Sequence, residues 1–221
     1  MEPISPTDSL EFPAGPSGVT LSGALFIPDR PVGLVAFAHG SGSSRFSPRN
    51  QAVARFLNQG GLATLLFDLL TAQEQEADQY THRFRFDIAL LTERLVGAID
   101  WLGGHPATSG LAIGLFGAST GAAAALRAAA ERPAAVAAVV SRGGRPDLAE
   151  DRLAAVRAPT LLIVGGEDAP VIELNRQAAQ RLGAVHRLEI IPGASHLFEE
   201  PGTLDRVAEL ARAWFLRHLH R

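Results

Sequence analysis

The chain has 221 residues, the size of one domain with a substantial core, and its 47% hydrophobic and 19% charged residues are typical of a globular protein. A formal net charge of -3 without basic runs argues against nucleic acid or an anionic membrane as the main partner. Because cysteine is absent, disulfides, thiolate metal sites and a cysteine nucleophile are excluded. With neither a signal-peptide pattern nor an apolar run of membrane-spanning length, we expect a single cytoplasmic domain, residues 1–221.

The N-terminal segment predicts a loose arm followed by a hairpin. Residues 1–18 are rich in proline, and we expect residues 1–8 to form the arm. Residues 9–12 and 19–27 flank the turn-forming sequence Gly-Pro-Ser-Gly, which makes them candidate antiparallel strands.

The next unit predicts a buried strand, a loop and a helix. Residues 32–38 (VGLVAFA) are almost continuously apolar, as in a strand covered on both faces of a parallel sheet, and His-Gly-Ser-Gly follows directly. Ser47 has the features of an N-cap and Pro48 those of a first helical residue. This helix is expected to stop at Gly60 and Gly61.

Residues 62–68 predict the following strand, and we interpret Asp68 at its end as a hydrogen-bonding support. The stretch 71–83 is polar and has no period, so it is our candidate for a small lid. Apolar side chains then recur at helical spacing from Ile88 to Leu102, which predicts a helix that ends at two glycines.

The stretch 111–129 (LAIGLFGASTGAAAALRAA) is the centre of the prediction. Its apolar first part predicts a buried strand, and its alanine-rich second part predicts a helix. Ser119 lies at the sharp turn between them with Gly117 and Gly121 two residues away on either side, a pattern typical of a nucleophile elbow. Such a turn exposes the hydroxyl at a helix N-terminus, where free N–H groups and the helix dipole favour negative charge.

The second half of the chain continues the alternation of strand and helix. Asp147 and Glu150 have capping-box spacing, which predicts a short helix. Pro170 predicts a helix whose N-cap is Ala169. The remaining strands are expected at 135–140, 160–164 and 185–191, and the last helix at 203–219.

This order of elements predicts an α/β fold with a mostly parallel sheet of about 7–8 strands and helices on both faces. In such a sheet, residues just past the carboxyl ends of the strands meet at one edge, where ligands bind. The residues expected at that edge are His39, Asp68, Ser119, Ser141, Asp168 and His196.

Ser119, Asp168 and His196 form the candidate catalytic triad. A serine hydroxyl is a weak nucleophile near neutral pH, so it needs a base within hydrogen-bonding reach and a carboxylate that keeps this base in the correct tautomer. The three residues follow predicted strands in the order nucleophile, acid, histidine, and His196 lies between the last strand and the last helix.

Each of these residues has a competing interpretation. A G-x-S-x-G pattern arises by chance in some glycine-rich chains, Asp168 is also placed to cap the helix near Pro170, and His196 is also a polar loop residue. Asp147 is a rival acid, although its capping-box spacing already accounts for it. His39 is either a second base or a structural hydrogen-bond donor.

The tetrahedral intermediate of an acyl transfer needs N–H donors around its negative oxygen. One donor is expected from the backbone of Thr120, which follows the nucleophile. The other is expected from the loop after residues 32–38, with Ser41 as the first choice and Gly42 as the alternative.

Several side chains near these loops are candidates for contact with the substrate. Arginines that follow a strand can bind a carboxylate of the substrate, or they are solvated or paired with protein carboxylates at the edge of the site. Aromatic rings near the loops either line the pocket or pack in the core or on the surface. The candidates are His39, Phe46, Tyr80, Arg142, Arg145 and Phe198.

No spacing indicates a metal site or a nucleotide loop, so we expect no metal and no cofactor. The expected partner is a small-molecule ester, and the oligomeric state stays open.

Four segments, HGSGSS, GASTG, GGEDAP and GASHLF, occur in this order, and with them the chain resembles the α/β-hydrolase superfamily over essentially its whole length. Its compactness and the stretch GASTGAAAALRAAAERPAAVAAVVSRGGRPDL are most similar to small proteins grouped with dienelactone hydrolases. Dienelactone hydrolases proper use a cysteine nucleophile, whereas this chain has Ser119 and no cysteine. The resemblance therefore implies an ester or lactone hydrolase, without implying dienelactone as the substrate.

The resemblance also bears on the shape of the cleft. Larger relatives insert a helical cap after the strand that follows the nucleophile helix, and residues 140–160 leave room here only for a short helix. We therefore expect no large cap domain and an open cleft that suits short-chain or aromatic esters. The expected chemistry is acyl transfer to water through an acyl-enzyme on Ser119. The alternatives are a thioester, amide or carbon–carbon bond as the target, and a hydrolase-fold binding protein whose triad is idle.

Overall fold

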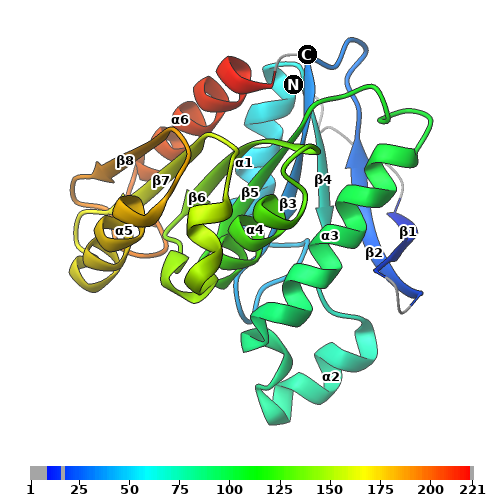
Figure 1. Cartoon of the computed structure of the whole chain (residues 1–221), viewed down its shortest axis with the longest axis horizontal. Helices are drawn as coiled ribbons and strands as arrows, with labels where there is room; N and C mark the ends of the chain where they lie inside the picture. Colours follow the sequence, from blue (N-terminus) through cyan, green and yellow to red (C-terminus); the bar gives the residue numbers. More distant parts are fainter. Residues whose placement is uncertain (1–8, 16–17, 220–221) are drawn as a thin grey trace.

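A computed structural model describes residues 9–15 and 18–219 as one central sheet with helices on both faces (Figure 1). The arm predicted at residues 1–8 lies outside the described residues. The predicted fold class is confirmed, and no large cap domain is inserted between the strands and helices that follow the nucleophile helix.

The sheet has eight strands in the order β1-β2-β4-β3-β5-β6-β7-β8. The first three in this order pair antiparallel, and all pairs from β4 to β8 are parallel. The N-terminal hairpin and the mostly parallel sheet are therefore as predicted. The strands are β1 (Ser9–Ala14), β2 (Val19–Phe26), β3 (Gly33–Ala38), β4 (Leu62–Phe67), β5 (Ile113–Ala118), β6 (Val136–Arg142), β7 (Thr160–Gly165) and β8 (His186–Ile191).

Helices follow most of the parallel strands. They are α1 (Pro48–Gln59), α2 (Ala72–Thr81), α3 (Ile88–Gly104), α4 (Thr120–Glu131), α5 (Ala169–Arg181) and α6 (Thr203–His218), together with the 3-10 helices η1 (Phe84–Phe86) and η2 (Pro146–Ala155). Within residues 9–15 and 18–219, none of the helices is long and apolar enough to cross a membrane.

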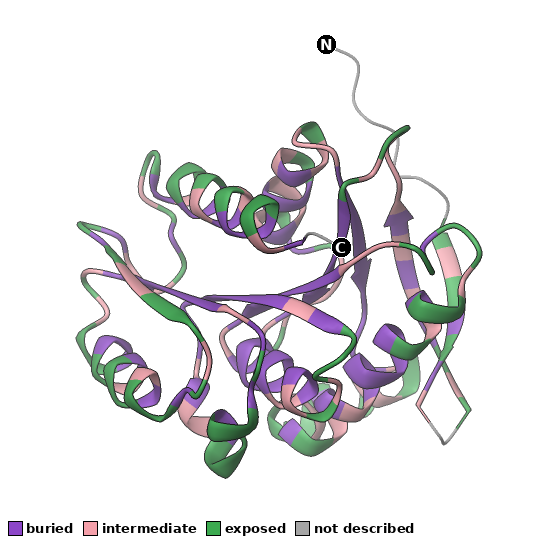
Figure 2. Ribbon diagram, turned by 45° about the horizontal axis from the view of Figure 1, so that its top comes forward, coloured by how far each residue is buried: buried purple, intermediate pink, exposed green. Residues whose placement is uncertain are grey.

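The sheet separates two hydrophobic cores, and Figure 2 shows that the buried residues lie along the strands and on the helix faces turned toward them. The first core joins the sheet to α3 and α4, and fully buried Leu126 belongs to it. The second core joins the sheet to α1 and α6, and fully buried Phe215 belongs to it. Burial on both faces explains why residues 32–38 and 160–164 are almost continuously apolar.

Helix α1 begins and ends as predicted. The Ser47 side chain accepts a hydrogen bond from the backbone N–H of Asn50 at 3.3 Å, and Pro48 is the first helical residue. Gly60 is the C-cap residue. The loop that begins with His-Gly-Ser-Gly therefore runs from the end of β3 to the Ser47 N-cap.

The polar stretch 71–83, which lacks the period of a helix, contains α2. A capping box starts this helix, since the Thr71 side chain accepts from the Glu74 N–H and the Glu74 carboxylate accepts from the Thr71 N–H. Asp78 is buried and accepts hydrogen bonds from the Arg85 side chain and from two backbone N–H groups of the next turn. Helix α2 is therefore stabilised by capping and ion pairing, whereas a helix packed in the core is stabilised mainly by the burial of apolar side chains.

The short helix predicted at Asp147 is present as η2, but two predicted N-caps are wrong. Asp147 caps nothing, because it lies inside the first turn of η2 and binds the Arg145 guanidinium through two hydrogen bonds of 2.9 and 2.7 Å. Glu150 has non-helical dihedral angles (φ 55°, ψ -127°), so it cannot complete a capping box. The N-cap residue of α5 is Asp168 and not Ala169, and the Asp168 side chain makes no capping hydrogen bond.

Candidate active site

Ser119 occupies a strained turn between β5 and α4. Its dihedral angles (φ 50°, ψ -120°) are ones that residues with a Cβ rarely adopt. The turn is so tight that a Cβ on Gly117 would lie 2.4 Å from the Cα of Ala122, and a Cβ on Gly121 would lie 2.2 Å from the carbonyl oxygen of Ala38. Both flanking glycines are therefore required by close backbone contact, as the pattern predicted.

The structure brings Asp168 and His196 together. Nδ1 of His196 lies 2.6 Å from Oδ2 of Asp168, and the carboxylate is mostly buried whereas the imidazole is partly exposed. Because an ionised carboxylate only accepts hydrogen bonds, Nδ1 is the donor, which leaves the lone pair of a neutral ring on Nε2. This is the tautomer that a general base next to a serine requires.

Ser119 and His196 each contact the end of β6. The Ser119 N–H donates to the carbonyl oxygen of Arg142 at 3.2 Å, and the next residue, Gly143, lies against His196. A Cβ on Gly143 would be 3.5 Å from both Cε1 and Nδ1 of the imidazole. The contacts of the described residues do not include a hydrogen bond between the Ser119 hydroxyl and Nε2, and such bonds often form only once substrate is bound.

Glu200, which the sequence analysis did not single out, holds the loop that carries His196. Its carboxylate accepts the N–H of Ser195 at 3.0 Å, and hydrogen bonds from Ser195 lower the pKa of Glu200 below its ordinary value. Phe198, in the same loop, has a positive φ of 55° and is buried. No sequence pattern signals Glu200, because its role depends on how the loop folds back on itself.

The candidate oxyanion donors lie together, although one of them is already engaged. Thr120 is the first residue of α4, and its hydroxyl accepts the N–H of Ser41 at 2.9 Å. Gly40 approaches Ser119 so closely that a Cβ there would lie 3.2 Å from the Cβ of Ser119. Gly42 has a positive φ of 71°. Its N–H has no hydrogen bond among the described residues, so the geometry leaves Gly42 free to act as a donor.

His39 is engaged at both ring nitrogens. Nδ1 lies 3.0 Å from the carbonyl oxygen of Gly40, and Nε2 accepts the backbone N–H of Leu69 at 3.1 Å. Burial lowers the pKa of His39, and this effect outweighs the opposing influences of the Gly40 carbonyl and of Asp68. A neutral ring with both nitrogens occupied favours the structural interpretation over that of a second base.

Asp68, interpreted as a support, and Asp147, the rival acid, also have structural partners. Asp68 is buried and accepts the backbone N–H of Arg45 at 2.8 Å as well as the Arg45 side chain, so it supports the loop as predicted. Asp147 is bound to Arg145, and this pairing raises the pKa of Arg145 above its ordinary value. Arg145 is therefore committed to a neighbouring carboxylate.

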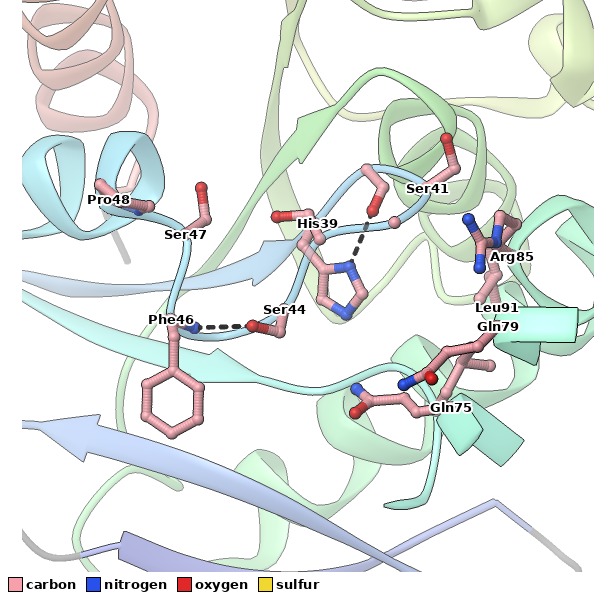
Figure 3. A pocket seen from close by; sticks show the side chains of 14 residues that line it. His39, Ser41, Ser44, Phe46, Ser47, Pro48, Gln75, Gln79, Arg85 and Leu91 are labelled. Carbon is pink, nitrogen blue, oxygen red and sulfur yellow. Dashed lines mark hydrogen bonds between the residues drawn. The ribbon is translucent and has the colours of Figure 1, made fainter. Parts of the chain in front are cut away.

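A pocket of about 410 Å³ lies between the β3–α1 loop and α2 (Figure 3). Hydroxyl groups of the loop line one side, and Gln75, Gln79 and Arg85 line the other. Nη1 of Arg85 lies 3.6 Å from the position of a Cβ on Gly42, so a guanidinium faces the oxyanion loop. The lid candidate thus forms a pocket wall, and that wall is polar.

The remaining substrate-contact candidates lie in different surroundings. Phe46 lines the pocket, and its ring packs under the Arg45 guanidinium, 4.3 Å from the charged carbon. Tyr80 is 85% exposed, and Phe198 is 2% exposed within the second core, so neither ring walls this pocket. Arg142 is buried and has no carboxylate partner among the described residues.

Within the part of the chain that the structure describes, no three His, Cys, Asp or Glu side chains gather in a way that could hold a metal ion. The groups that the structure brings to this edge are a serine, a histidine, a carboxylate and backbone N–H groups.

Comparison with known proteins places this geometry in a family. The model of the Dienelactone hydrolase family matches residues 21–218. A solved dienelactone hydrolase from Anabaena variabilis is 59% identical, with a TM-score of 0.91 over 96% of this chain and 99% of that one. Est1E from Butyrivibrio proteoclasticus, solved with ferulic acid bound, is 19% identical over 91% of this chain and 96% of that one, with a TM-score of 0.74, and shares the fold.

A longer protein is also similar. The chain is 54% identical over 212 residues to a protein of Mycobacterium tuberculosis (strain ATCC 25618 / H37Rv) named "Putative phosphoribosyl transferase". The match covers 96% of this chain and 46% of that protein, so the chain spans about half the length of the curated relative.

Proposed function

Because the chain belongs to the dienelactone hydrolase family, we propose that it hydrolyses carboxylic ester or lactone bonds with Ser119, His196 and Asp168. The observation that carries the proposal is the strained Ser119 at a helix N-terminus, with the end of β6 shared between it and a His196 whose Nδ1 is bound to Asp168 at 2.6 Å. The family's hydrolase fold supports hydrolysis in general, and the residue types at this edge favour an acyl-enzyme route.

The proposed reaction has two halves. Nε2 of His196 takes the proton of the Ser119 hydroxyl as Oγ attacks the carbonyl carbon, and Asp168 stabilises the imidazolium through Nδ1–H. The leaving alcohol departs with the proton from His196, which leaves an acyl group on Ser119. His196 then takes a proton from water, the hydroxide attacks the acyl carbon, and the proton returns to Ser119 as the acid is released.

The oxyanion of both tetrahedral intermediates would be bound by backbone donors. The N–H of Thr120 is one, at the N-terminus of α4 where the helix dipole adds to its effect. The N–H of Gly42 is the better second donor in this geometry, because that of Ser41 already donates to the Thr120 hydroxyl. Ser41 becomes a donor only if the Thr120 side chain rotates away.

The pocket lining argues for a small acyl group. Serine hydroxyls, two glutamine amides and the Arg85 guanidinium share a volume of about 410 Å³ with the Phe46 ring, Leu70 and Leu91, and neither Ser119 nor His196 is among the lining residues. We therefore favour short-chain or small aromatic esters or lactones, whose oxygens the glutamine and Arg85 side chains can bind. The transferase name of the mycobacterial relative belongs to a protein about twice as long and does not decide what the shared half does.

The test combines a covalent probe with a panel of 4-nitrophenyl esters and lactones. We expect a fluorophosphonate to label Ser119 and the esters to turn over, with Ser119→Ala abolishing labelling and lowering kcat by about 10³-fold or more. Ser109→Ala, an exposed serine away from the candidate active site, is the matched control and should keep both signals. Labelling without turnover would point to a thioester or amide substrate, and no labelling would favour an idle binding protein.

A further inference from the structure

Arg142 is a cation buried without a partner. Its side chain is 8% exposed, and its Nε and Nη1 atoms are enclosed with no hydrogen-bond partner among the described residues. Burial lowers the pKa of Arg142 to about 10, and the nearby charge of Arg49 adds to this effect. The guanidinium is therefore still charged at neutral pH, and a second cation is close to it.

Arg142 ends β6 on the side of the sheet that α1 and α6 cover. Side chains alternate along a strand, and Val139 belongs to the first core whereas Val140 belongs to the second, so Arg142 points to the same side as Val140. Arg49 lies in the first turn of α1, which holds no acidic residue. The side of the sheet that Arg142 faces is therefore the side on which α1 carries a second guanidinium and the positive end of its dipole.

The acidic groups nearby leave this charge unbalanced. Glu199 lies 3.2 Å from Nη1 of Arg49, but its side chain is 63% exposed and makes no hydrogen bond to Arg142. Nε of Arg49 is itself buried without a partner among the described residues. One exposed carboxylate therefore pairs with Arg49, and Arg142 has none among the described residues, whereas buried charges in folded proteins are normally paired.

We propose that Arg142 and Arg49, with the N-terminus of α1, bind a small oxyanion, meaning a phosphate-like ion or a carboxylate. Guanidinium groups bind oxygen anions through charge-assisted hydrogen bonds, and the dipole of α1 favours the same ligands. The backbone of α1 adds little beyond this dipole, because Pro48 has no N–H and the N–H groups of Asn50 and Gln51 already donate to Ser47. This site goes beyond the proposed ester hydrolysis and does not depend on it.

The bound anion would connect three segments around the candidate active site. Arg142 supplies the carbonyl oxygen that accepts the Ser119 N–H, Arg49 starts α1, and Glu199 belongs to the loop that carries His196. Occupancy should therefore stabilise the fold at the edge where the triad meets.

The test measures thermal unfolding of the full chain while sodium phosphate replaces sodium chloride at constant ionic strength. We expect phosphate to raise the Tm of the wild type and to leave the Tm of Arg142→Met unchanged. In chloride the Arg142→Met variant should be at least as stable as the wild type, because it removes an uncompensated buried charge. Arg55→Met, an exposed arginine of the same helix, is the matched control and should keep the response to phosphate.

A second variant keeps the test decisive if Arg142→Met does not fold. Arg49→Met should raise the Kd for phosphate about tenfold, the loss expected for one charge-assisted hydrogen bond. A wild type whose Tm does not distinguish phosphate from chloride would overturn the proposal. So would an Arg142→Met variant that is destabilised equally in both salts, because Arg142 would then act only in packing.

Two ester substrates distinguish whether the bound anion is a carboxylate of the substrate or a free ion. If it is a carboxylate of the substrate, Arg142→Met should raise the KM of mono-4-nitrophenyl succinate about tenfold or more and leave that of 4-nitrophenyl acetate unchanged. If it is a free ion, the two KM values should change in parallel. The thermal measurement needs no turnover, so a failure of the proposed hydrolysis would remain distinguishable from a failure of the anion site.

Discussion

Ser119 holds a backbone conformation that costs on the order of 1–3 kcal/mol in a residue with a Cβ, so the contacts around it must keep it there. Its N–H donates to the Arg142 carbonyl, and its own carbonyl accepts the N–H groups of Ala122 and Arg145. These hydrogen bonds fix the residue from β6, from α4 and from the loop after β6. The serine is therefore positioned both by the helix that follows it and by the segment at the end of the neighbouring strand β6.

The first prediction at the residue scale concerns which carboxylate orients His196. Asp168→Asn should lower kcat by about 10³-fold or more, because an amide can donate to Nδ1 and so stabilise the tautomer whose proton faces Ser119. Asp147→Asn is the control, since Asp147 is bound to Arg145, and should change kcat by only a few-fold. Steady-state kinetics with one activated ester measure kcat for both variants. Equal losses of kcat would mean that neither carboxylate specifically orients His196.

The second residue-scale prediction concerns pH. Burial lowers the pKa of His39 in the folded chain, whereas in the unfolded chain it titrates near its ordinary value of about 6.5. Below that value the unfolded chain binds more protons, so the His39 contribution to stability is present above about pH 6.5 and is lost as the pH falls.

The measurement is urea unfolding between pH 7.5 and 5. His39→Gln, which can keep hydrogen bonds to the Gly40 carbonyl and the Leu69 N–H, should make the free energy of unfolding less dependent on pH than in the wild type. The same substitution at exposed His186 is the control. An unchanged slope in His39→Gln would mean that other groups cause the loss of stability in acid.

Helix α2 shows that an element can be held by polar contacts at its ends. Burial by itself would raise the pKa of Asp78, but hydrogen bonds from the Arg85 side chain and from the Phe84 and Arg85 N–H groups together outweigh it, and the pKa lies below its ordinary value. A second ion pair joins Glu74 to Arg94 of α3. These contacts hold the wall of the pocket in place.

The element-scale prediction follows from this arrangement. Asp78→Asn should destabilise α2 by about 1–3 kcal/mol, because buried donors lose a charged acceptor. Hydrogen exchange should accelerate within residues 72–81 and remain slow in the sheet, and the KM for a good ester substrate should rise more than kcat falls. Glu76→Gln, at an exposed position of the same helix, should match the wild type in both measurements.

The molecule as a whole is a sheet between two cores, and its stability requires both. Phe215 fills the second core so tightly against β5 that a Cβ on Gly114 would lie 2.6 Å from its ring. Phe215→Ala should therefore lower the free energy of unfolding by about 3–5 kcal/mol. Leu216→Ala, one residue further on and 37% exposed, should cost less than about 1 kcal/mol. Chemical denaturation measures both, and equal costs would contradict the assignment of α6 to the core.

Local patterns predicted much of this architecture. The apolar run at 32–38, the Ser47–Pro48 helix start and the two glycines around Ser119 each specify a local structure that tertiary packing did not alter. The capping-box spacing of Asp147 failed because a neighbouring arginine competed for the same carboxylate. Helix α2 lacked a periodic pattern because its stabilising contacts are ion pairs and caps, which leave no apolar stripe.

The sequence alone predicted the order of the elements, the turn at Ser119 and the placement of Asp168 and His196 at the same edge of the sheet. These features are predictable because backbone geometry and hydrophobic periodicity act over a few residues. Only the tertiary structure decided that Ser41 donates to Thr120, that both nitrogens of His39 are occupied and that Arg142 is buried beside Arg49. Each of these depends on the distance between segments far apart in the chain. Hydrogen bonds and charge interactions act only across the short distances that folding creates, so no local sequence pattern predicts these contacts.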